Sequence, residues 1–166
     1  MVLTPDTSGI PRLVGDNSPE NYTLAPGQLA NFPGGVWVLS GNDTVRGSSD
    51  SELIFGNDDR DSLSGGVGDD SIYGGKGDDD VLGEIGNDFL TGDRNSDFVD
   101  GGAGNDFLRG GRGIDLLVGG EGNDSLIGDV DVDIYKGGAG SDVFVFRVDQ
   151  AGIRVAGIEV PDAVIV

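Results

Sequence analysis

Between Val38 and Val145 the chain repeats one pattern of apolar and polar residues every nine positions, twelve times, without insertion or deletion. Position 8 of the repeat is always apolar or aromatic, as Val45, Ile54, Leu63, Ile72, Val81, Leu90, Val99, Leu108, Leu117, Leu126, Tyr135 and Phe144. One inward residue between two outward neighbours fits a strand of about three residues, because side chains alternate across a strand. The pattern therefore predicts an all-β chain of twelve short strands.

Small turn-forming residues recur with the same period as the apolar position. Position 1 is Gly in eleven of the twelve repeats, and position 4 is Gly, Asn or Asp in all of them. These residues adopt a left-handed backbone more readily than others. Each repeat is therefore predicted to be a short strand plus a tight turn of about six residues.

A single nine-residue unit buries almost nothing, so the units must stack to make a core. Two units close one coil of 18 residues, and twelve units give about six coils, roughly 28 Å long at ~4.7 Å per strand. Odd-numbered repeats then form one parallel sheet and even-numbered repeats form the other. The predicted fold is a parallel β-roll solenoid over residues 38–145.

The segments on either side of the repeats lack this period. Residues 1–37 are expected to be an irregular N-terminal arm or cap, because proline lacks the donor that a central strand requires; this segment holds Pro5, Pro11, Pro19, Pro26 and Pro33. Residues 146–166 are expected to form a C-terminal cap, because an exposed sheet end invites association.

Charge and missing residue types exclude several classes of function. Thirty acidic residues face ten basic ones, for a net charge of −20, so the chain repels nucleic acid and anionic membranes. The chain has no Cys and no His, which excludes disulfides, zinc sites of the His type and His-dependent catalytic triads. No apolar run approaches the ~20 residues of a membrane span, and no signal peptide pattern follows Met1.

Position 6 carries a carboxylate in every repeat, namely Asp43, Glu52, Asp61, Asp70, Asp79, Asp88, Asp97, Asp106, Asp115, Asp124, Asp133 and Asp142. Stacked coils would place these carboxylates in columns, where uncompensated charges repel strongly. Calcium takes 6–8 oxygen ligands in flexible geometry, whereas magnesium demands a strict octahedron. A solvated acidic face is the alternative, but a spacing that stays fixed through all twelve repeats favours calcium.

The full phrase GG-x-G-x-D occurs in the repeats that start at Gly65, Gly74, Gly101, Gly110, Gly119 and Gly137. On this motif the chain resembles the RTX, or haemolysin-type calcium-binding, β-roll family over Val38–Val145. The resemblance implies a right-handed parallel β-roll with calcium between turns on the same side. It also implies a secreted or cell-surface bacterial protein, exported by a type I system through an uncleaved C-terminal signal, for which residues 146–166 are the candidate.

The resemblance implies a ligand set for each calcium ion. One turn offers the carbonyls of positions 2 and 4 with its position-6 carboxylate, and the turn one coil later offers the carbonyls of positions 1 and 3 with its own carboxylate. On one side this joins Gly66, Gly68 and Asp70 to Gly83, Ile85 and Asp88; Gly102, Gly104 and Asp106 to Gly119, Glu121 and Asp124; and Gly120, Gly122 and Asp124 to Gly137, Ala139 and Asp142.

On the other side the same rule joins Gly75, Gly77 and Asp79 to Gly92, Arg94 and Asp97, and Gly111, Gly113 and Asp115 to Gly128, Val130 and Asp133. The remaining candidates are Asp43, Asp61, Gly74, Gly86, Gly101, Ala103, Gly110 and Arg112. Five gaps on each side allow up to about ten calcium ions, whose +20 would offset the net charge of −20.

Departures from the motif weaken particular sites. Repeat 2 has Asp50 at the turn and Glu52 in place of Asp, so sites that touch repeats 1 and 2 are expected to be the weakest. Arg94 and Arg112 fall inside turns, where their side chains either hinder calcium or point outward.

Positions 7 and 9 should face outward, yet many are apolar: Leu53, Phe55, Tyr73, Phe89, Phe107, Ile127, Val143 and Val145 on the even sheet, and Leu82, Phe98, Leu116, Val118 and Ile134 on the odd sheet. Either the flanking segments cover one face, or the chain self-associates or binds a partner there.

The sequence is consistent with three functions. The leading one is calcium binding with calcium-dependent folding. The alternatives are a structural or adhesive solenoid and a non-catalytic fragment of a larger RTX enzyme. Catalysis by this chain is not expected, because it lacks the residue types that catalytic sites of that family use.

Overall fold

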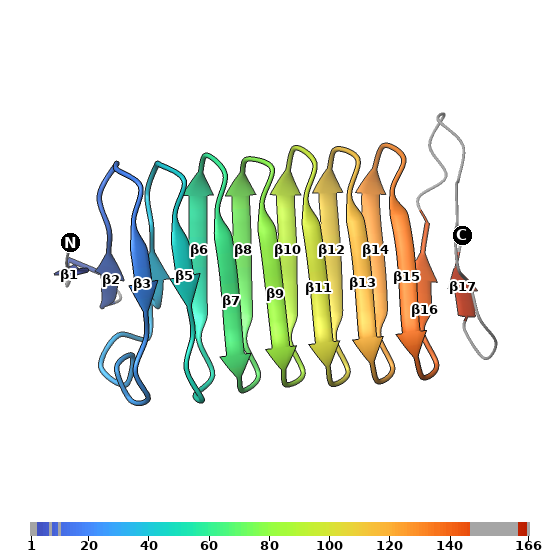
Figure 1. Cartoon of the computed structure of the whole chain (residues 1–166), viewed down its shortest axis with the longest axis horizontal. Helices are drawn as coiled ribbons and strands as arrows, with labels where there is room; N and C mark the ends of the chain where they lie inside the picture. Colours follow the sequence, from blue (N-terminus) through green and yellow to red (C-terminus); the bar gives the residue numbers. More distant parts are fainter. Residues whose placement is uncertain (1–2, 7, 10, 147–162, 166) are drawn as a thin grey trace.

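Two β-sheets, parallel except where β1 pairs antiparallel with β2, run along one roll, with each coil stacked on the one before it (Figure 1). The computed structural model describes residues 3–6, 8–9, 11–146 and 163–165. Helix is absent from these residues, and so is any helical segment that could cross a membrane.

The first sheet has ten strands in the order β1-β2-β4-β6-β8-β10-β12-β14-β16-β17. Their bounds are Thr4–Asp6, Arg12–Val14, Val36–Trp37, Leu53–Asp58, Ser71–Lys76, Phe89–Arg94, Phe107–Arg112, Ser125–Val130, Val143–Val145 and Ala163–Ile165. The second sheet has seven strands in the order β15-β13-β11-β9-β7-β5-β3. From β3 to β15 these are Asn21–Thr23, Thr44–Arg46, Ser62–Val67, Asp80–Ile85, Phe98–Ala103, Leu116–Glu121 and Ile134–Ala139.

The register of the sheets confirms that two repeats make one coil. In the first sheet Ile72 pairs with Leu90, which pairs with Leu108, and all of these strands are parallel. Positions 7 to 9 of the even-numbered repeats lie in this sheet, and positions 7 to 9 of the odd-numbered repeats lie in the second. The all-β parallel roll predicted from the nine-residue period is confirmed.

The strands are longer than the sequence indicated. A regular strand runs through positions 7 to 9 and continues through positions 1 to 3 of the next repeat, so only positions 4 to 6 form the turn. The expectation of a three-residue strand with a six-residue turn was wrong. Gly75 and Gly111, at position 2, have φ of 115° and 113°, and the strand bends at such residues without losing its pairing to the neighbouring coil.

The core is a double row of position-8 side chains, one row from each sheet. Ile72, Leu90 and Leu108 from the first sheet and Val81 and Val99 from the second are 0% exposed. Each coil adds two such side chains to the interior. The predicted inward position is therefore confirmed, and no coil has a core of its own.

The segment 1–37, expected to be irregular, extends both sheets at the N-terminal end. Leu13 of β2 pairs with Val36, and Tyr22 of β3 pairs with Val45. Both pairs are further apart in the sequence than two regular repeats, because residues 24–35 include extra turns. The roll therefore begins about one coil before the regular repeats.

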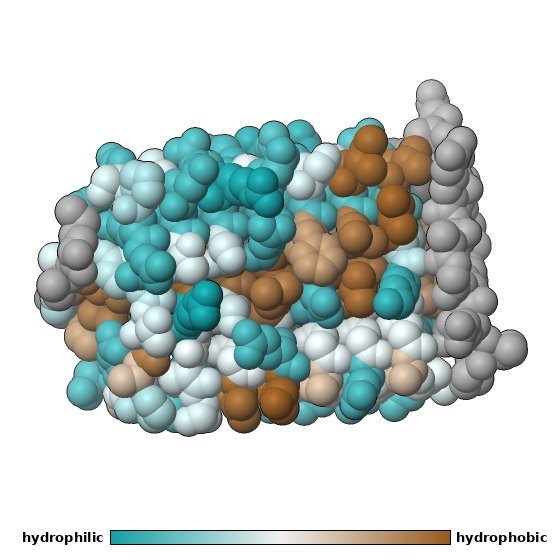
Figure 2. Space-filling model, in the orientation of Figure 1, coloured by the Kyte–Doolittle hydropathy of each residue, from teal (hydrophilic) through white to brown (hydrophobic). Residues whose placement is uncertain are grey.

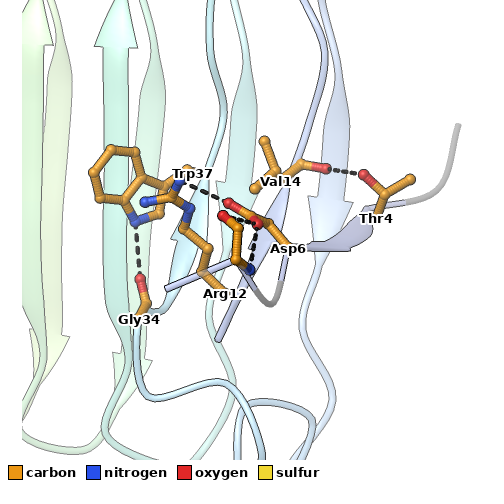
Figure 3. Close-up of polar contacts among 7 residues, drawn as sticks. Thr4, Asp6, Arg12, Val14, Gly34 and Trp37 are labelled. Carbon is orange, nitrogen blue, oxygen red and sulfur yellow. Dashed lines mark hydrogen bonds and ion pairs between the residues drawn. The ribbon is translucent and has the colours of Figure 1, made fainter. Parts of the chain in front are cut away.

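Trp37 on β4 anchors this first coil (Figure 3). The Arg12 guanidinium lies 4.4 Å from the centre of its ring, and the indole N–H donates to the Gly34 carbonyl at 2.8 Å. Arg12 also pairs with Asp6 on β1 at 2.7 Å. At the other end β17 pairs with β16, while the rest of the predicted cap after Phe146 lies outside the described residues.

Large apolar side chains remain exposed on the outer faces. Ile114, Leu116 and Ile134, on or just before β13 and β15, are 59%, 37% and 48% exposed. Figure 2 shows apolar side chains gathered toward the C-terminal end of the roll. The N-terminal strands β1 to β3 add to the sheet edges and leave these outer faces uncovered, so self-association through them stays a prediction.

Candidate metal centre: two columns of buried carboxylates

The position-6 acids form two columns, one along each edge of the roll where the turns lie. The first column is Glu20, Asp43, Asp61, Asp79, Asp97, Asp115 and Asp133, and the second is Glu52, Asp70, Asp88, Asp106, Asp124 and Asp142. Every one of these residues is buried. Buried carboxylates are rare unless they are paired or bind a metal.

Hydrogen bonds fix the spacing within each column. The Oδ1 atom of each aspartate in the columns accepts the backbone N–H of the corresponding acidic residue one coil earlier. Asp88 N–H donates to Asp106 at 2.8 Å, and Asp106 N–H donates to Asp124 at 2.9 Å. The same bond joins Asp79 to Asp97 at 2.9 Å on the other edge. Successive carboxylates are therefore held one strand spacing apart, as the period predicts.

The second carboxylate oxygen has no hydrogen-bond partner along most of both columns. This holds for Oδ2 of Asp43, Asp61, Asp70, Asp79, Asp88, Asp97, Asp106, Asp115 and Asp124. One buried acceptor without a partner costs roughly 1–3 kcal/mol, and more when it is charged. A row of them at one structural position indicates that a cation belongs there.

Glycine at position 1 leaves room beside each of these oxygens. A Cβ on Gly83 would collide with the Asp88 carboxylate and with the carbonyl of Gly101 in the next coil. A Cβ on Gly119 would collide in the same way with Asp124 and with the Gly137 carbonyl. The carboxylate of one turn and the position-1 carbonyl of the next therefore approach a common point, which is the pairing that the predicted ligand set requires.

The other predicted ligands also meet across the gap between coils. Gly68 N–H donates to the Ile85 carbonyl, and Gly104 N–H to the Glu121 carbonyl, both at 2.8 Å. On the opposite edge the corresponding bond, from Gly77 to Arg94, is longer at 3.4 Å. A carbonyl oxygen has two lone pairs, so each of these acceptors retains one for a metal.

Within the described residues no three acidic or other metal-ligating side chains converge on one point. A gap between two turns contains two carboxylates, so a cation bound there takes its remaining ligands from backbone carbonyls. Calcium accepts such a mixture of carboxylate and carbonyl oxygens. The donor set therefore fits calcium, and it offers none of the nitrogen or sulfur ligands that zinc prefers.

Burial changes the acidity of the columns. It raises the pKa of Asp97 to about 8 and the pKa of Asp70 and Asp106 to about 7, although the backbone N–H that each carboxylate accepts acts in the opposite direction. Neighbouring carboxylates in the column raise these pKa values further. At neutral pH, ionisation of the column carboxylates therefore destabilises the folded chain when no cation is bound.

This acidity predicts how the metal-free roll responds to pH. The folded pKa values lie above the ordinary value of 3.8, so the folded chain binds more protons than the unfolded chain between these limits. The contribution of these carboxyl groups to the stability of the metal-free roll is therefore full below about pH 3.8 and is lost progressively as pH rises toward about 8, so the roll is more stable near pH 5 than at pH 8. Far-UV circular dichroism of metal-stripped protein should show more strand near pH 5; strand content that rises with pH would contradict this.

Sequence reasoning missed Glu20, which belongs to the first column. Its N–H donates to Asp43 at 2.7 Å, and its carboxylate lies where a Cβ on Gly15 would be. Gly15 and Glu20 have the same separation as Gly65 and Asp70, so the signal was present. The longer loop that follows interrupts the period and hid this turn.

Two position-6 acids differ from the rest because the protein itself satisfies their carboxylates. Both oxygens of Glu52 accept hydrogen bonds from Ser48, from its N–H at 3.0 Å and its hydroxyl at 2.5 Å. The Tyr135 hydroxyl hydrogen-bonds Asp133, which lowers the pKa of that carboxyl against the stronger effect of burial. These contacts leave both carboxylates less able to bind a cation, and weak calcium sites at repeats 1 and 2 stay a prediction.

The side chains of Arg94 and Arg112 are exposed and line an outer groove, while the Arg94 carbonyl accepts the Gly77 N–H across the gap. Of the two arrangements that the sequence left open, the structure has the one in which the cationic groups stay clear of the columns.

Comparison with known families agrees with this geometry. The model of the RTX calcium-binding nonapeptide repeat matches in overlapping copies at residues 37–63, 46–81, 55–90, 73–108, 82–117 and 109–144. The chain belongs to the RTX calcium-binding repeat family. No curated protein matches the chain as a whole. The RTX match begins at residue 37 and so omits the Gly15–Glu20 turn, although that turn has the same hydrogen bond to the next coil.

Proposed function

We propose that this RTX roll binds calcium ions in the gaps between successive turns of each column and that it folds when they bind. The observation that carries the proposal is the row of buried carboxylate oxygens without partners. The regular gaps of the second column are the best candidates. One of them would use Gly102, Gly104 and Asp106 with Gly119, Glu121 and Asp124.

Calcium would supply the positive charge that the columns lack, and the protein would supply the carboxylate and carbonyl oxygens that coordinate it. Because only the folded chain binds the metal, the free energy of binding adds to the free energy of folding. The backbone ladder that holds Asp88, Asp106 and Asp124 in line sets the distance between the two carboxylates of each gap. Folding is therefore coupled to calcium through the stacking of coils, and no single repeat forms a site.

The site supports a binding role without catalysis. RTX repeats are calcium-binding modules found generally in secreted bacterial proteins. We infer that this chain is exported in an unfolded, calcium-poor state and folds in the millimolar calcium outside the cell. The high negative charge favours an extended chain until calcium arrives.

Metal analysis of the folded protein tests the proposal. Protein equilibrated with calcium and freed of excess ion by gel filtration should retain several ions per chain, up to one per gap. Magnesium at the same concentration should leave the chain largely without metal, because magnesium holds its water shell. Retention of one calcium ion or none per folded chain would refute the proposal.

A further inference from the structure

A groove of about 680 Å³ crosses the outer face of the first sheet. It is lined by the last two residues of five neighbouring strands, β6, β8, β10, β12 and β14, together with Arg109. Four of the ten basic residues of the chain, Lys76, Arg94, Arg109 and Arg112, lie there. The lining also holds Asp58, Asp93 and Asp129, so its formal charge is +1 in a chain whose net charge is −20, and this local excess of positive charge favours an anionic ligand.

Three of these cations form a row along the roll. Lys76, Arg94 and Arg112 occupy the same position on β8, β10 and β12, so each is one strand spacing, ~4.8 Å, from the next at the backbone. A ligand that meets this row must itself present acceptors at short, regular intervals. An extended polymer that lies along the axis of the roll satisfies this requirement.

Two of the four cations already have acidic partners and two do not. Lys76 pairs with Asp58 at 2.7 Å, and Arg109 pairs with Asp129. Arg94 and Arg112 are exposed and have no ion pair with any described residue. A guanidinium group binds a carboxylate through two parallel hydrogen bonds, which makes this pair the anchor of the groove.

The acidic residues of the groove narrow the choice of ligand. Asp129 is buried and already pairs with Arg109. Asp58 and Asp93, both half-buried, lie among the cations, and their carboxylates accept hydrogen bonds but cannot donate them. A polyanion that bears only acceptors would be repelled by them, whereas hydroxyl groups would donate to them. The lining therefore suits a polymer that carries both carboxylates and hydroxyls.

The neighbouring aromatic side chains argue against single-stranded nucleic acid. Phe89 and Phe107, on the same sheet, stack on each other at 5.2 Å with an interplanar angle of 4°. Phe55 and Tyr73 stack likewise at 4.8 Å. Rings that cover each other's faces offer few open faces to bases, and base stacking on such faces is what single-strand binding requires.

We propose that this groove binds an acidic polysaccharide, with Arg94 and Arg112 pairing to uronate carboxylates and Asp58 and Asp93 accepting hydrogen bonds from sugar hydroxyls. The inference goes beyond calcium binding, since it uses the outward side chains of Arg94 and Arg112, whereas the predicted calcium ligands at these positions are backbone carbonyls. A solenoid suits such a ligand because its strands present the same position at every coil.

Calorimetric titration of calcium-loaded protein with tetragalacturonate tests this proposal. Binding should weaken by about tenfold or more in the Arg94→Ala/Arg112→Ala double variant, because two charge-assisted pairs are lost. The control is Arg46→Ala/Lys136→Ala, which removes the same charge from exposed positions on the second sheet and should change affinity by about twofold at most. Neutral cellotetraose should not bind.

Far-UV circular dichroism of the same samples establishes that each variant is folded. If the alanine variant loses its strand spectrum, Arg94→Gln/Arg112→Gln takes its place, because it removes the charges and keeps much of the side-chain length. Equal affinity of the wild type and a folded Arg94/Arg112 variant would overturn the proposal. So would equal loss in the control, or tighter binding of a short single-stranded DNA than of tetragalacturonate.

Discussion

Stripping calcium from the protein at about pH 7.5 is expected to abolish its strand structure. At this pH the carboxylates of each column, roughly 4.8 Å apart, either ionise, so that two neighbouring charges repel by about 3 kcal/mol at an effective dielectric constant of 20, or keep protons that the unfolded chain does not bind. Asp88, Asp106 and Asp124 are buried, so solvent screens this repulsion poorly. The free energy of unfolding of a whole domain is typically about 5–15 kcal/mol, so several repulsions of this size are enough to unfold the roll.

Circular dichroism in the far ultraviolet measures the effect directly. Addition of EGTA should convert the strand spectrum to that of an unfolded chain, and excess calcium should restore it. Magnesium in place of calcium is the matched control and should restore little, because of its stricter geometry. A strand spectrum that persists in EGTA at this pH would show that the roll folds without metal.

The second large effect is expected from Asp106→Asn, in the middle of the second column. Asp106 borders two gaps, because it faces Asp88 in the coil before it and Asp124 in the coil after it. The amide oxygen of Asn still accepts the Asp88 N–H, so the backbone ladder remains. The charge and the free Oδ2 are lost, so both gaps lose a ligand. We expect up to two fewer calcium ions per chain.

Calcium titrations followed by circular dichroism should place the folding midpoint of Asp106→Asn at a calcium concentration higher by about tenfold or more. The control is Asp80→Asn, which removes the same charge from the outer surface, where Asp80 pairs with Arg60 at 2.9 Å. Surface ion pairs contribute about 0–1 kcal/mol, so this variant should titrate much as the wild type does. Equal shifts in both variants would mean that net charge, and not the column, governs folding.

The sequence predicted most of the fold because its period coincides with the structural repeat. Leu90 and Leu108 are two repeats apart in the sequence and adjacent in the sheet. The same period identified the carboxylates of the columns, since a fixed spacing places like residues above one another. The prediction failed where the period is interrupted, so that Glu20 and strands β2 and β3 were not recognised.

The pattern of apolar and polar residues also did not predict the length of the strands. Alternation of apolar and polar residues marks strands, but positions 1 to 3 are mostly glycine and polar residues and show no alternation. Their pairing, as between Arg94 and Arg112, exists only because the coil before and the coil after present matching backbone groups. Backbone hydrogen bonding between coils is a tertiary property that side-chain patterns do not encode.

The sequence alone determined the repeat, the inward row of apolar residues, the position of every carboxylate from Asp43 to Asp142 and the calcium chemistry they suggest. The tertiary structure decided which oxygen of each carboxylate is satisfied by a backbone N–H and which is left for a cation. It also decided that Lys76, Arg94 and Arg112 line one groove. The physical reason is the same in both cases. Residues two repeats apart become neighbours only when the coil closes. Closure of the coil also buries the charged groups, and burial sets the free energy of each charge.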